Sequence, residues 1–337
     1  MSTPTIPPAP GTKSLGMLRR IERMSDADGY IRVAAIDHPE NYVALFDPDL
    51  GKVSFEEVVD SKLELIRGMA PHCSAVLVDP VWSYGQGVLT GSIPGTVGII
   101  SGLEQLAYSP SGFGTDTVVR DAWTVPVLAR LGADGAKLVV FYREERPDVV
   151  ETQLELVRGI VAQCREHEIP LIIEPLWYPL DGESLDDPGV RAARIEAIIA
   201  SAATFAERGA NIMKVEFPGY VGSPEDEAEA AKACARLDAA IDVPWVLLSA
   251  SATFDQFAVQ LRIAAEAGAC GFMAGRAIWG DGVGRHDAET RARGVRTAAE
   301  RLDALAEVLR SYARPWRESV TVSEAVEALP ADWHERY

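Results

Sequence analysis

Short, almost continuously apolar segments alternate with longer amphipathic segments along most of the chain. Apolar runs of four to eight residues bounded by turn residues are typical of buried strands. We therefore predict eight strands, at residues 31–37, 75–79, 96–101, 136–142, 171–175, 211–218, 245–249 and 271–275. We predict helices at residues 15–24, 54–69, 147–167, 187–208, 224–240, 255–267 and 287–312.

Strands without polar alternation are expected where a parallel sheet is covered on both faces. Repeated strand–helix units indicate a parallel α/β protein. A doubly wound sheet fits this alternation equally well, but no G-x-G-x-x-G motif opens a helix after the first strand. Eight units favour closure, so we predict an α/β fold of the single (β/α)8 TIM barrel type.

The predicted barrel spans residues 15–313 as one domain. Residues 1–14 are proline-rich and are predicted to form a flexible N-terminal tail. Residues 314–337 are predicted to be a C-terminal extension that packs on the barrel, and residues 109–116 a loop rich in glycine and serine.

Composition narrows the classes of partner. The chain has 337 residues, of which 47% are hydrophobic, so it can bury a large core. Its net charge of −18 argues against nucleic acid and anionic membranes as partners, although a local cationic cluster could still bind a small anion. The N-terminus has no signal-peptide core, and no apolar run could span a bilayer. The four cysteines lack CxxC spacing, as expected of buried thiols in a cytoplasmic protein.

Polar side chains stand in or directly after most of the predicted strands. In (β/α)8 barrels the carboxyl ends of the strands meet at one mouth, where active sites lie. The residues expected there are Asp37, His38, Asp79, Lys137, Glu174, Lys214, Glu216, Ser249, Gly275 and Arg276.

Lys214 stands between Met213 and Val215 in an apolar segment. Side chains alternate along a strand, so Lys214 and Glu216 are expected on one face and Met213, Val215 and Phe217 on the other. Burial and a neighbouring cation lower the pKa of a lysine and make its amine nucleophilic. The alternative is an edge-strand lysine that reaches solvent.

Lys137 lies in an apolar strand in the same way, and two ammonium groups facing one cavity would lower each other's pKa. Glu174 follows an apolar run and could transfer protons at a substrate hydroxyl or a carbinolamine. The alternative for Glu174 is a structural ion pair with a lysine.

The ends of the last two strands suggest an anion site. Small residues at Ser249, Ala250 and Gly275 would let backbone amides approach a phosphate, and Arg276 adds a planar guanidinium. The alternative for Arg276 is a solvated charge at the start of a helix.

Five segments together resemble the class I tagatose-bisphosphate aldolase family, which includes sulfofructosephosphate aldolases and belongs to the Schiff-base-forming barrel aldolases. They are Ala-Lys-Leu-Val-Val-Phe-Tyr at 136–142, Ile-Glu-Pro-Leu at 173–176, Asn-Ile-Met-Lys-Val-Glu-Phe-Pro at 211–218, Leu-Ser-Ala at 248–250 and Ala-Gly-Arg-Ala-Ile-Trp at 274–279. The resemblance runs from about residue 29 to about residue 280. It implies that Lys214 forms a Schiff base, Glu174 acts as acid and base, Lys137 polarises the site, and Ser249 and Arg276 hold a substrate anion.

The loop after the first strand departs from that family, which usually reads Asp-Gln-Arg where this chain has Asp37, His38 and Pro39. The far end of the substrate is therefore expected to differ from the usual sugar phosphates. Asp37 and His38 are substrate-binding candidates: His38 could hydrogen-bond a hydroxyl or assist proton transfer, or be an ordinary loop histidine.

The five histidines are widely spaced, which disfavours a zinc-dependent reaction and leaves no metal or cofactor implied. We predict a class I aldolase that cleaves a ketose phosphate or bisphosphate to dihydroxyacetone phosphate and an aldehyde. The alternatives are a phosphosugar isomerase or epimerase, and a regulator that binds a sugar phosphate. A homo-oligomer is compatible with the sequence, which does not set the subunit number.

Overall fold

The structure is a computed structural model that describes residues 14–105, 108–109, 112–113, 117–250, 252–317, 319–335 and 337. Almost all of the predicted tail at residues 1–14 and most of the predicted loop at 109–116 lie outside these residues.

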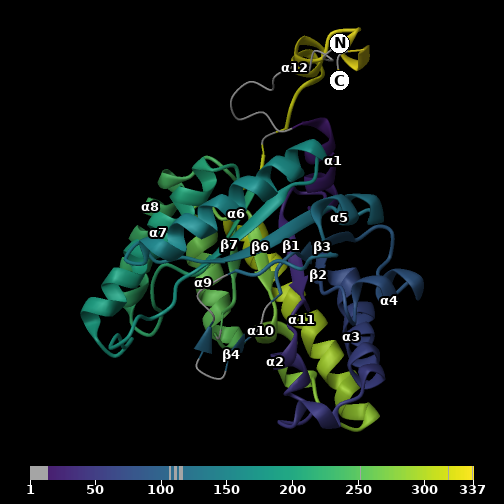
Figure 1. Cartoon of the computed structure of the whole chain (residues 1–337), viewed down its shortest axis with the longest axis vertical. Coiled ribbons are helices and arrows are strands. Elements are labelled where there is room, and N and C mark those ends of the chain that lie inside the picture. The colour runs from purple at the N-terminus through teal and green to yellow at the C-terminus, as the bar shows by residue number, and fades with distance from the viewer. Residues whose placement is uncertain are drawn as a thin grey trace.

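Eight parallel strands close into a barrel in the order β1-β10-β9-β8-β7-β6-β3-β2, which confirms the predicted fold (Figure 1). The strands are β1 (Ile31–Ala35), β2 (Ala75–Val78), β3 (Gly98–Gly102), β6 (Gly135–Phe141), β7 (Leu171–Leu176), β8 (Ile212–Val215), β9 (Trp245–Leu248) and β10 (Gly271–Ala274). A separate hairpin pairs β4 (Tyr108–Ser109) with β5 (Gly112–Phe113).

Helices surround the barrel, and the long ones match the predicted ranges. They are α3 (Phe55–Met69), α6 (Pro147–Glu166), α7 (Pro188–Glu207), α8 (Pro224–Ala240), α9 (Phe254–Ala267) and α11 (Ala288–Tyr312). Local chemistry starts them where expected: Ser54 and Glu57 form a reciprocal capping box on α3, and Pro147 occupies the first turn of α6.

The short elements were not predicted from the sequence, because one or two turns do not display a helical period. These are α2 (Glu40–Val43), α4 (Tyr84–Leu89), α5 (Val125–Leu131), α10 (Arg276–Trp279) and α12 (Val322–Ala328), together with the 3₁₀ turns Leu50–Lys52, Ala70–His72, Gly280–Gly282 and Trp333–Glu335.

Strand alternation sorts side chains into two layers. On β8, Ile212 points into the barrel interior, where it packs in one cluster with Ile172 and Val246. Met213 and Val215 point outward into the larger core beneath the helices. Lys214 shares the inward face of β8 with Ile212, one step closer to the mouth.

Helix α1 (Leu15–Arg23) closes the amino-terminal end of the barrel. Ile21 and the following Met24 are fully buried and belong to the same cluster as the interior strand residues. Figure 1 shows α1 at one end of the barrel and α2, α10 and β4 gathered at the other. With the amino-terminal end plugged, access to the interior is from the carboxyl ends of the strands.

The segment after α11 contacts the plugged end at a few points. The amide of Trp316 donates to the Gly29 carbonyl at 3.1 Å, and the amide of Gly16 donates to the Tyr337 hydroxyl at 3.1 Å. Helix α12 between these points has no buried residue and stands away from the barrel in Figure 1. The division of the chain at residues 14 and 313 stays a prediction.

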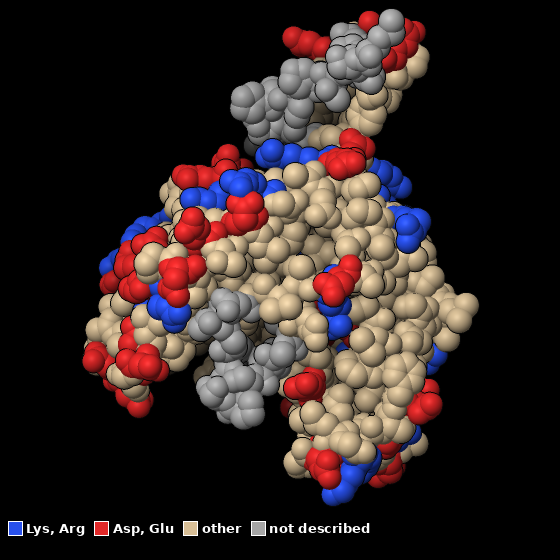
Figure 2. All heavy atoms as spheres, in the orientation of Figure 1, with Lys and Arg blue, Asp and Glu red and all other residues tan. Residues whose placement is uncertain are grey.

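The face shown in Figure 2 carries acidic and basic side chains interspersed over the outer helices, without a continuous basic patch on that face. No helix in the described part of the chain is both long enough and apolar enough to cross a bilayer.

Gly271 should be indispensable at the β1–β10 seam that closes the barrel. A Cβ atom there would lie 1.9 Å from the Ile31 carbonyl oxygen, so Gly271→Ala must displace paired backbone. We expect the free energy of unfolding to fall by about 1–3 kcal/mol or more. The matched control is Gly159→Ala on α6, where no atom lies within 4 Å of the new Cβ and helix propensity should add up to about 1 kcal/mol. Urea denaturation measures both, and equal stability of the two variants would contradict this account of the seam.

Candidate active site

Two lysines and a glutamate from neighbouring strands meet at the mouth of the barrel. The Nζ atoms of Lys214 on β8 and Lys137 on β6 lie 2.9 and 3.0 Å from the same Glu174 oxygen, Oε2. Strand register explains this, because Ile173 pairs with Met213 and so Glu174 stands beside Lys214. All three side chains are buried, as the sequence predicted for a shared site.

Three carboxylates surround the ammonium group of Lys137. Its Nζ lies 2.7 Å from Glu104, 2.9 Å from Asp37 and 3.0 Å from Glu174. Burial lowers the pKa of Lys137, but Asp37, Glu104 and Glu174 outweigh this and hold that pKa well above its usual value. The prediction that the two lysines would lower each other's pKa is therefore wrong for Lys137, which remains a cation.

Glu104 was not predicted as a site residue from the sequence. It follows β3, the weakest of the predicted strands, and is held by an isolated bridge between residues 104 and 119. Its other oxygen accepts from the Val139 amide at 3.3 Å, which fixes the carboxylate against β6. The one available signal was its position just after a strand, the same position that identified Asp37 and Asp79.

Glu174 is poised as an ionised base. Burial raises its pKa, but the charges of Lys137 and Lys214 outweigh burial and hold the pKa below its usual value. The same holds for Asp37: burial raises its pKa, but the charges of Lys137 and Lys214 outweigh burial and hold the pKa below its usual value. An ionised Glu174 can accept a proton from an ammonium group or a hydroxyl within hydrogen-bond reach.

Asp79 has a supporting role rather than a place beside the two lysines. It pairs with the fully buried Lys62 of α3 at 2.6 Å, and the same ammonium donates to the carbonyls of Ile36 and His38, each at 2.9 Å. These two carbonyls flank Asp37. Lys62 therefore positions the backbone that carries the Asp37 carboxylate.

His38 connects the ends of β1 and β10. Its Nδ1 lies 3.7 Å from an Asp37 oxygen, and its ring meets Trp279 edge to face at 5.2 Å. Burial lowers the pKa of His38 to about 4, although Asp37 opposes the shift, so the ring is neutral near pH 7. A Cβ atom at Gly275 would lie 2.5 Å from the His38 ring, so the two residues are sterically matched.

The residues predicted to bind an anion lie together at the ends of β9 and β10. The Gly275 amide donates to Ser249 Oγ at 3.3 Å. Ala250 has a φ of +44°, a left-handed conformation that an alanine rarely adopts. Arg276 is exposed at the start of α10. Strain in a non-glycine residue beside a strand end is often found at functional sites.

Glu216 lies outside the lysine cluster. Its carboxylate pairs with Arg194 of α7 at 2.8 Å and accepts from the Trp177 amide at 2.9 Å. These contacts hold the segment after β7 against α7. Met213, Val215 and Phe217 all pack in the outer core, as the strand pattern predicted.

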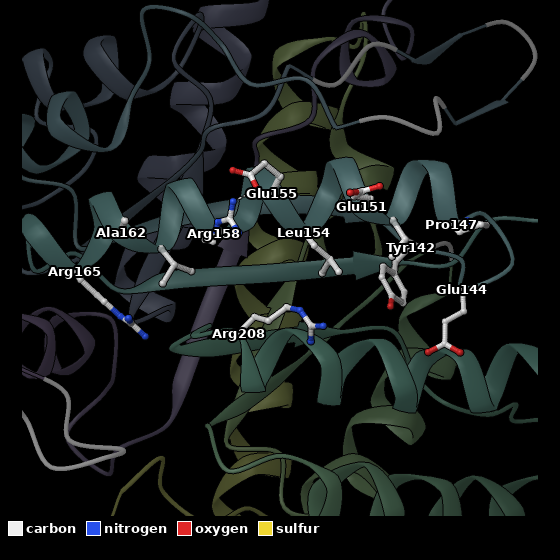
Figure 3. A pocket seen from close by; sticks show the side chains of 12 residues that line it. Tyr142, Glu144, Pro147, Glu151, Leu154, Glu155, Arg158, Ala162, Arg165 and Arg208 are labelled. Carbon is white, nitrogen blue, oxygen red and sulfur yellow. Dashed lines mark hydrogen bonds and ion pairs between the residues drawn. The ribbon is translucent and has the colours of Figure 1, made fainter.

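A groove with a volume of about 720 Å³ lies on the outer surface beside α6 (Figure 3). Its lining combines apolar side chains such as Leu154 with charged ones such as Arg165 and Arg208, and includes none of the three residues Lys137, Glu174 and Lys214. Across the residues that the structure describes, no group of three or more His, Cys, Asp or Glu side chains could hold a metal ion. The four cysteines are buried, and none of them is in a disulfide bond.

A closed (β/α)8 barrel with two lysines and a glutamate at its mouth has the groups needed for catalysis by a lysine amine. The profile of the DeoC/LacD family aldolases matches residues 35–281, and the chain belongs to this family. It is therefore an aldolase, a carbon–carbon lyase, rather than an isomerase or a non-catalytic regulator.

Similar proteins include a tagatose 1,6-diphosphate aldolase of Streptococcus agalactiae, 29% identical over 89% of this chain and 97% of that protein. A tagatose 1,6-diphosphate aldolase of Listeria monocytogenes is 25% identical over 89% of this chain and 94% of its own. Among solved structures, an archaeal fructose-1,6-bisphosphate aldolase has a TM-score of 0.56 and 17% identity, covering 87% of this chain and 99% of that one. That likeness shows the shared fold.

Lys62→Met should strongly destabilise the protein, because it leaves the Asp79 carboxylate buried without its cation. Removing one partner of a buried pair costs about 3–5 kcal/mol. The control is Lys232→Met on α8, whose lysine pairs with Glu229 at the surface and should contribute less than about 1 kcal/mol. Urea unfolding of both variants makes the comparison, and similar losses would show that Lys62 is not a buried anchor.

Neutral His38 should make the protein acid-sensitive. Its pKa is about 4 when folded and 6.5 in the reference state, so the unfolded chain binds more protons between these values. Stability is then complete above about pH 6.5 and falls as the pH drops towards 4, by at most about 1.4 kcal/mol per pH unit. His38→Gln should flatten this part of a stability–pH curve obtained by chemical denaturation. Asp37 and Glu174 have lowered pKa values and protonate at lower pH than His38, so they do not account for the slope in this range. An unchanged slope in His38→Gln would show that other groups cause the acid sensitivity.

Proposed function

We propose that the chain is a class I, metal-independent aldolase in which Lys214 forms a Schiff base with a ketose phosphate or bisphosphate. The products are dihydroxyacetone phosphate and an aldehyde. The observation that carries this is the unequal environment of the two lysines: Lys137 is held by three carboxylates, whereas Lys214 has one ion-pair partner among the described residues, Glu174. Lys214 is thus the amine that can lose its proton without leaving several carboxylates uncompensated.

The first step requires a free amine and a ketone carbon within reach. Glu174 accepts a proton from Lys214 across 2.9 Å, and the amine then attacks the carbonyl carbon. The carbonyl oxygen is protonated and leaves as water, which gives an iminium. Lys137, 3.0 Å from Glu174, stays charged and stabilises negative charge that develops on oxygen.

The iminium then withdraws electrons from the carbon–carbon bond next to it. Glu174 takes the proton from the hydroxyl on the far carbon, that carbon becomes the aldehyde, and the bonding pair passes into an enamine on Lys214. Protonation of the enamine carbon and hydrolysis of the resulting iminium release dihydroxyacetone phosphate and regenerate the amine.

The anion beside the ketone is assigned to Ser249, Ala250, Gly275 and Arg276. These residues directly follow β9 and β10, and β9 is paired with the strand that carries Lys214. Asp37 was predicted to bind substrate. Because its carboxylate pairs with Lys137 at 2.9 Å, we propose that it also orients Lys137. We propose His38, whose ring is neutral and next to Gly275, as a hydrogen-bond partner of a substrate hydroxyl.

The names of similar proteins agree with this proposal. The bacterial relatives are tagatose 1,6-diphosphate aldolases, and the archaeal structure is described as having its catalytic lysine covalently bound to the carbinolamine intermediate of its substrate. A small phosphorylated sugar is therefore the expected partner of this chain.

Sodium borohydride with dihydroxyacetone phosphate should reduce the Schiff base and add mass to a single peptide containing Lys214, read by mass spectrometry. Lys214→Met should abolish both the label and cleavage while the circular dichroism spectrum is retained. Glu174→Gln should lower turnover by about 10²–10⁴-fold, the usual contribution of a positioned acid or base, while some labelling persists. A label on Lys137, or none with wild-type protein, would overturn the assignment.

A further inference from the structure

The C-terminal arm, which we define as residues 319–337, carries a short helix that buries none of its side chains. This helix is α12, and its seven residues are fewer than the roughly 12–15 that an isolated helix needs in water. A reciprocal capping box between Thr321 and Glu324 satisfies its first amides but buries no apolar surface. Most of the stability of such a helix must therefore come from packing one of its faces against a partner.

One face of α12 is an apolar stripe. Val322, Val326 and Leu329 stand at i, i+4 and i+7, a spacing that places side chains on one side of a helix. Val322 is 82% exposed and Val326 is 67% exposed. Single exposed apolar side chains are common, whereas a contiguous exposed stripe is a feature of protein–protein interaction sites. Amphipathic helices bind apolar grooves through side chains at this spacing.

The chain holds α12 away from its own barrel. Before the arm, the Trp316 amide donates to the Gly29 carbonyl, and at its far end the Tyr337 hydroxyl donates to the Glu168 carboxylate. Both contacts lie at the amino-terminal end of the barrel, which α1 closes, and α12 stands beyond that end in Figures 1 and 2. The apolar stripe is therefore accessible to a second molecule.

The groove beside α6, which we call the α6 groove, offers a complementary surface (Figure 3). Its apolar side chains include Val150, Leu154 and Val161, which lie on one face of α6, and the first two are half-buried. The lining extends along α6 from Pro147 to Arg165, about 27 Å at 1.5 Å per residue. Helix α12 is about 10 Å long by the same measure, so it fits within the groove.

The charges of the α6 groove differ between its two ends. Figure 3 shows Arg158, Arg165 and Arg208 towards one end, and the acidic residues Glu144 and Glu151 towards the other. Arg158 is paired with a glutamate of its own helix, whereas neither Arg165 nor Arg208 makes an ion pair within 4.0 Å in the described part of the chain. Helix α12 contains two glutamates and no basic residue. Complementary charge therefore directs α12 to the arginine end.

We propose that α12 of one copy docks by its apolar stripe into the arginine end of the α6 groove of a second copy. One chain carries both the exposed stripe and a groove that fits it, so two copies can complete each other. Reciprocal docking forms a closed two-fold dimer. Neither surface includes Lys137, Glu174 or Lys214, so this inference is independent of the proposed function.

Sedimentation velocity of the full chain over a concentration series should reveal a dimer, and a variant ending at Arg317 should stay monomeric. Val326→Asp should raise the dissociation constant of the dimer about ten- to a hundredfold, because it removes one buried apolar side chain and sets a charge against the groove. Leu89→Asp, at an exposed leucine of α4, is the matched control and should leave this constant unchanged. A monomeric wild type, or a dimer that survives the truncation, would overturn the proposal.

The contribution of charge is tested by Arg165→Glu, which should weaken the dimer severalfold by reversing the attraction to the glutamates of α12. Arg130→Glu makes the same change of charge at an exposed arginine of α5, outside the groove, and should have no effect. Equal effects of the two variants would overturn docking at the arginine end.

Cross-linking of single-cysteine variants locates the contact. Val326→Cys and Leu154→Cys proteins, mixed and treated with a short bis-maleimide, should give a covalent dimer with one chain of each, identified by mass spectrometry. The four native cysteines are buried, which favours reaction of the introduced thiols. Leu89→Cys in place of Val326→Cys should give no cross-link. In a chain that carries both Val326→Cys and Leu154→Cys, a link formed within the monomer would show that α12 occupies its own groove and would overturn docking between copies.

Discussion

The arrangement at the mouth depends on one oxygen atom, Glu174 Oε2, which lies within 3.0 Å of two buried ammonium groups. Isolated charges are not tolerated away from water, so each must be balanced by its neighbours. Two ammonium groups, of Lys137 and Lys214, stand against three carboxylates, of Asp37, Glu104 and Glu174. Moving a proton from Lys214 to Glu174 keeps the net charge of the cluster unchanged. The transfer therefore adds no net charge to the buried site.

The barrel supplies this balance through alternation and register. Lys137, Glu174 and Lys214 all take inward positions on adjacent strands, above an apolar interior closed by α1. Behind them, Lys62 holds the carbonyls on either side of Asp37 from the helix layer. The geometry of the charged cluster is thus set by backbone pairing on one side and by a second buried ion pair on the other.

Much of this could be predicted from the sequence, because strands and long helices have periods that are visible locally. Lys214 stood out because a charge inside an apolar run conflicts with its surroundings. Glu104 and Lys62 gave no such signal. Glu104 lies in a polar stretch after a weak strand, and Lys62 lies on an amphipathic helix, where a lysine normally faces solvent. Their partners, Lys137 and Asp79, are 33 and 17 residues away, so only the folded barrel reveals that both are buried.

The overall charge of −18 and an anionic substrate are compatible because the two act over different distances. At physiological ionic strength exposed charges are screened beyond about 8 Å, so the acidic outer helices exert little force at the mouth. Within that distance, the charged side chains at the mouth determine whether an anion is attracted. Lys62 and Lys137 are already paired with carboxylates, whereas Arg276 is exposed at the start of α10. The exposed guanidinium of Arg276 at the edge of the mouth can therefore attract an anion although the protein as a whole repels it.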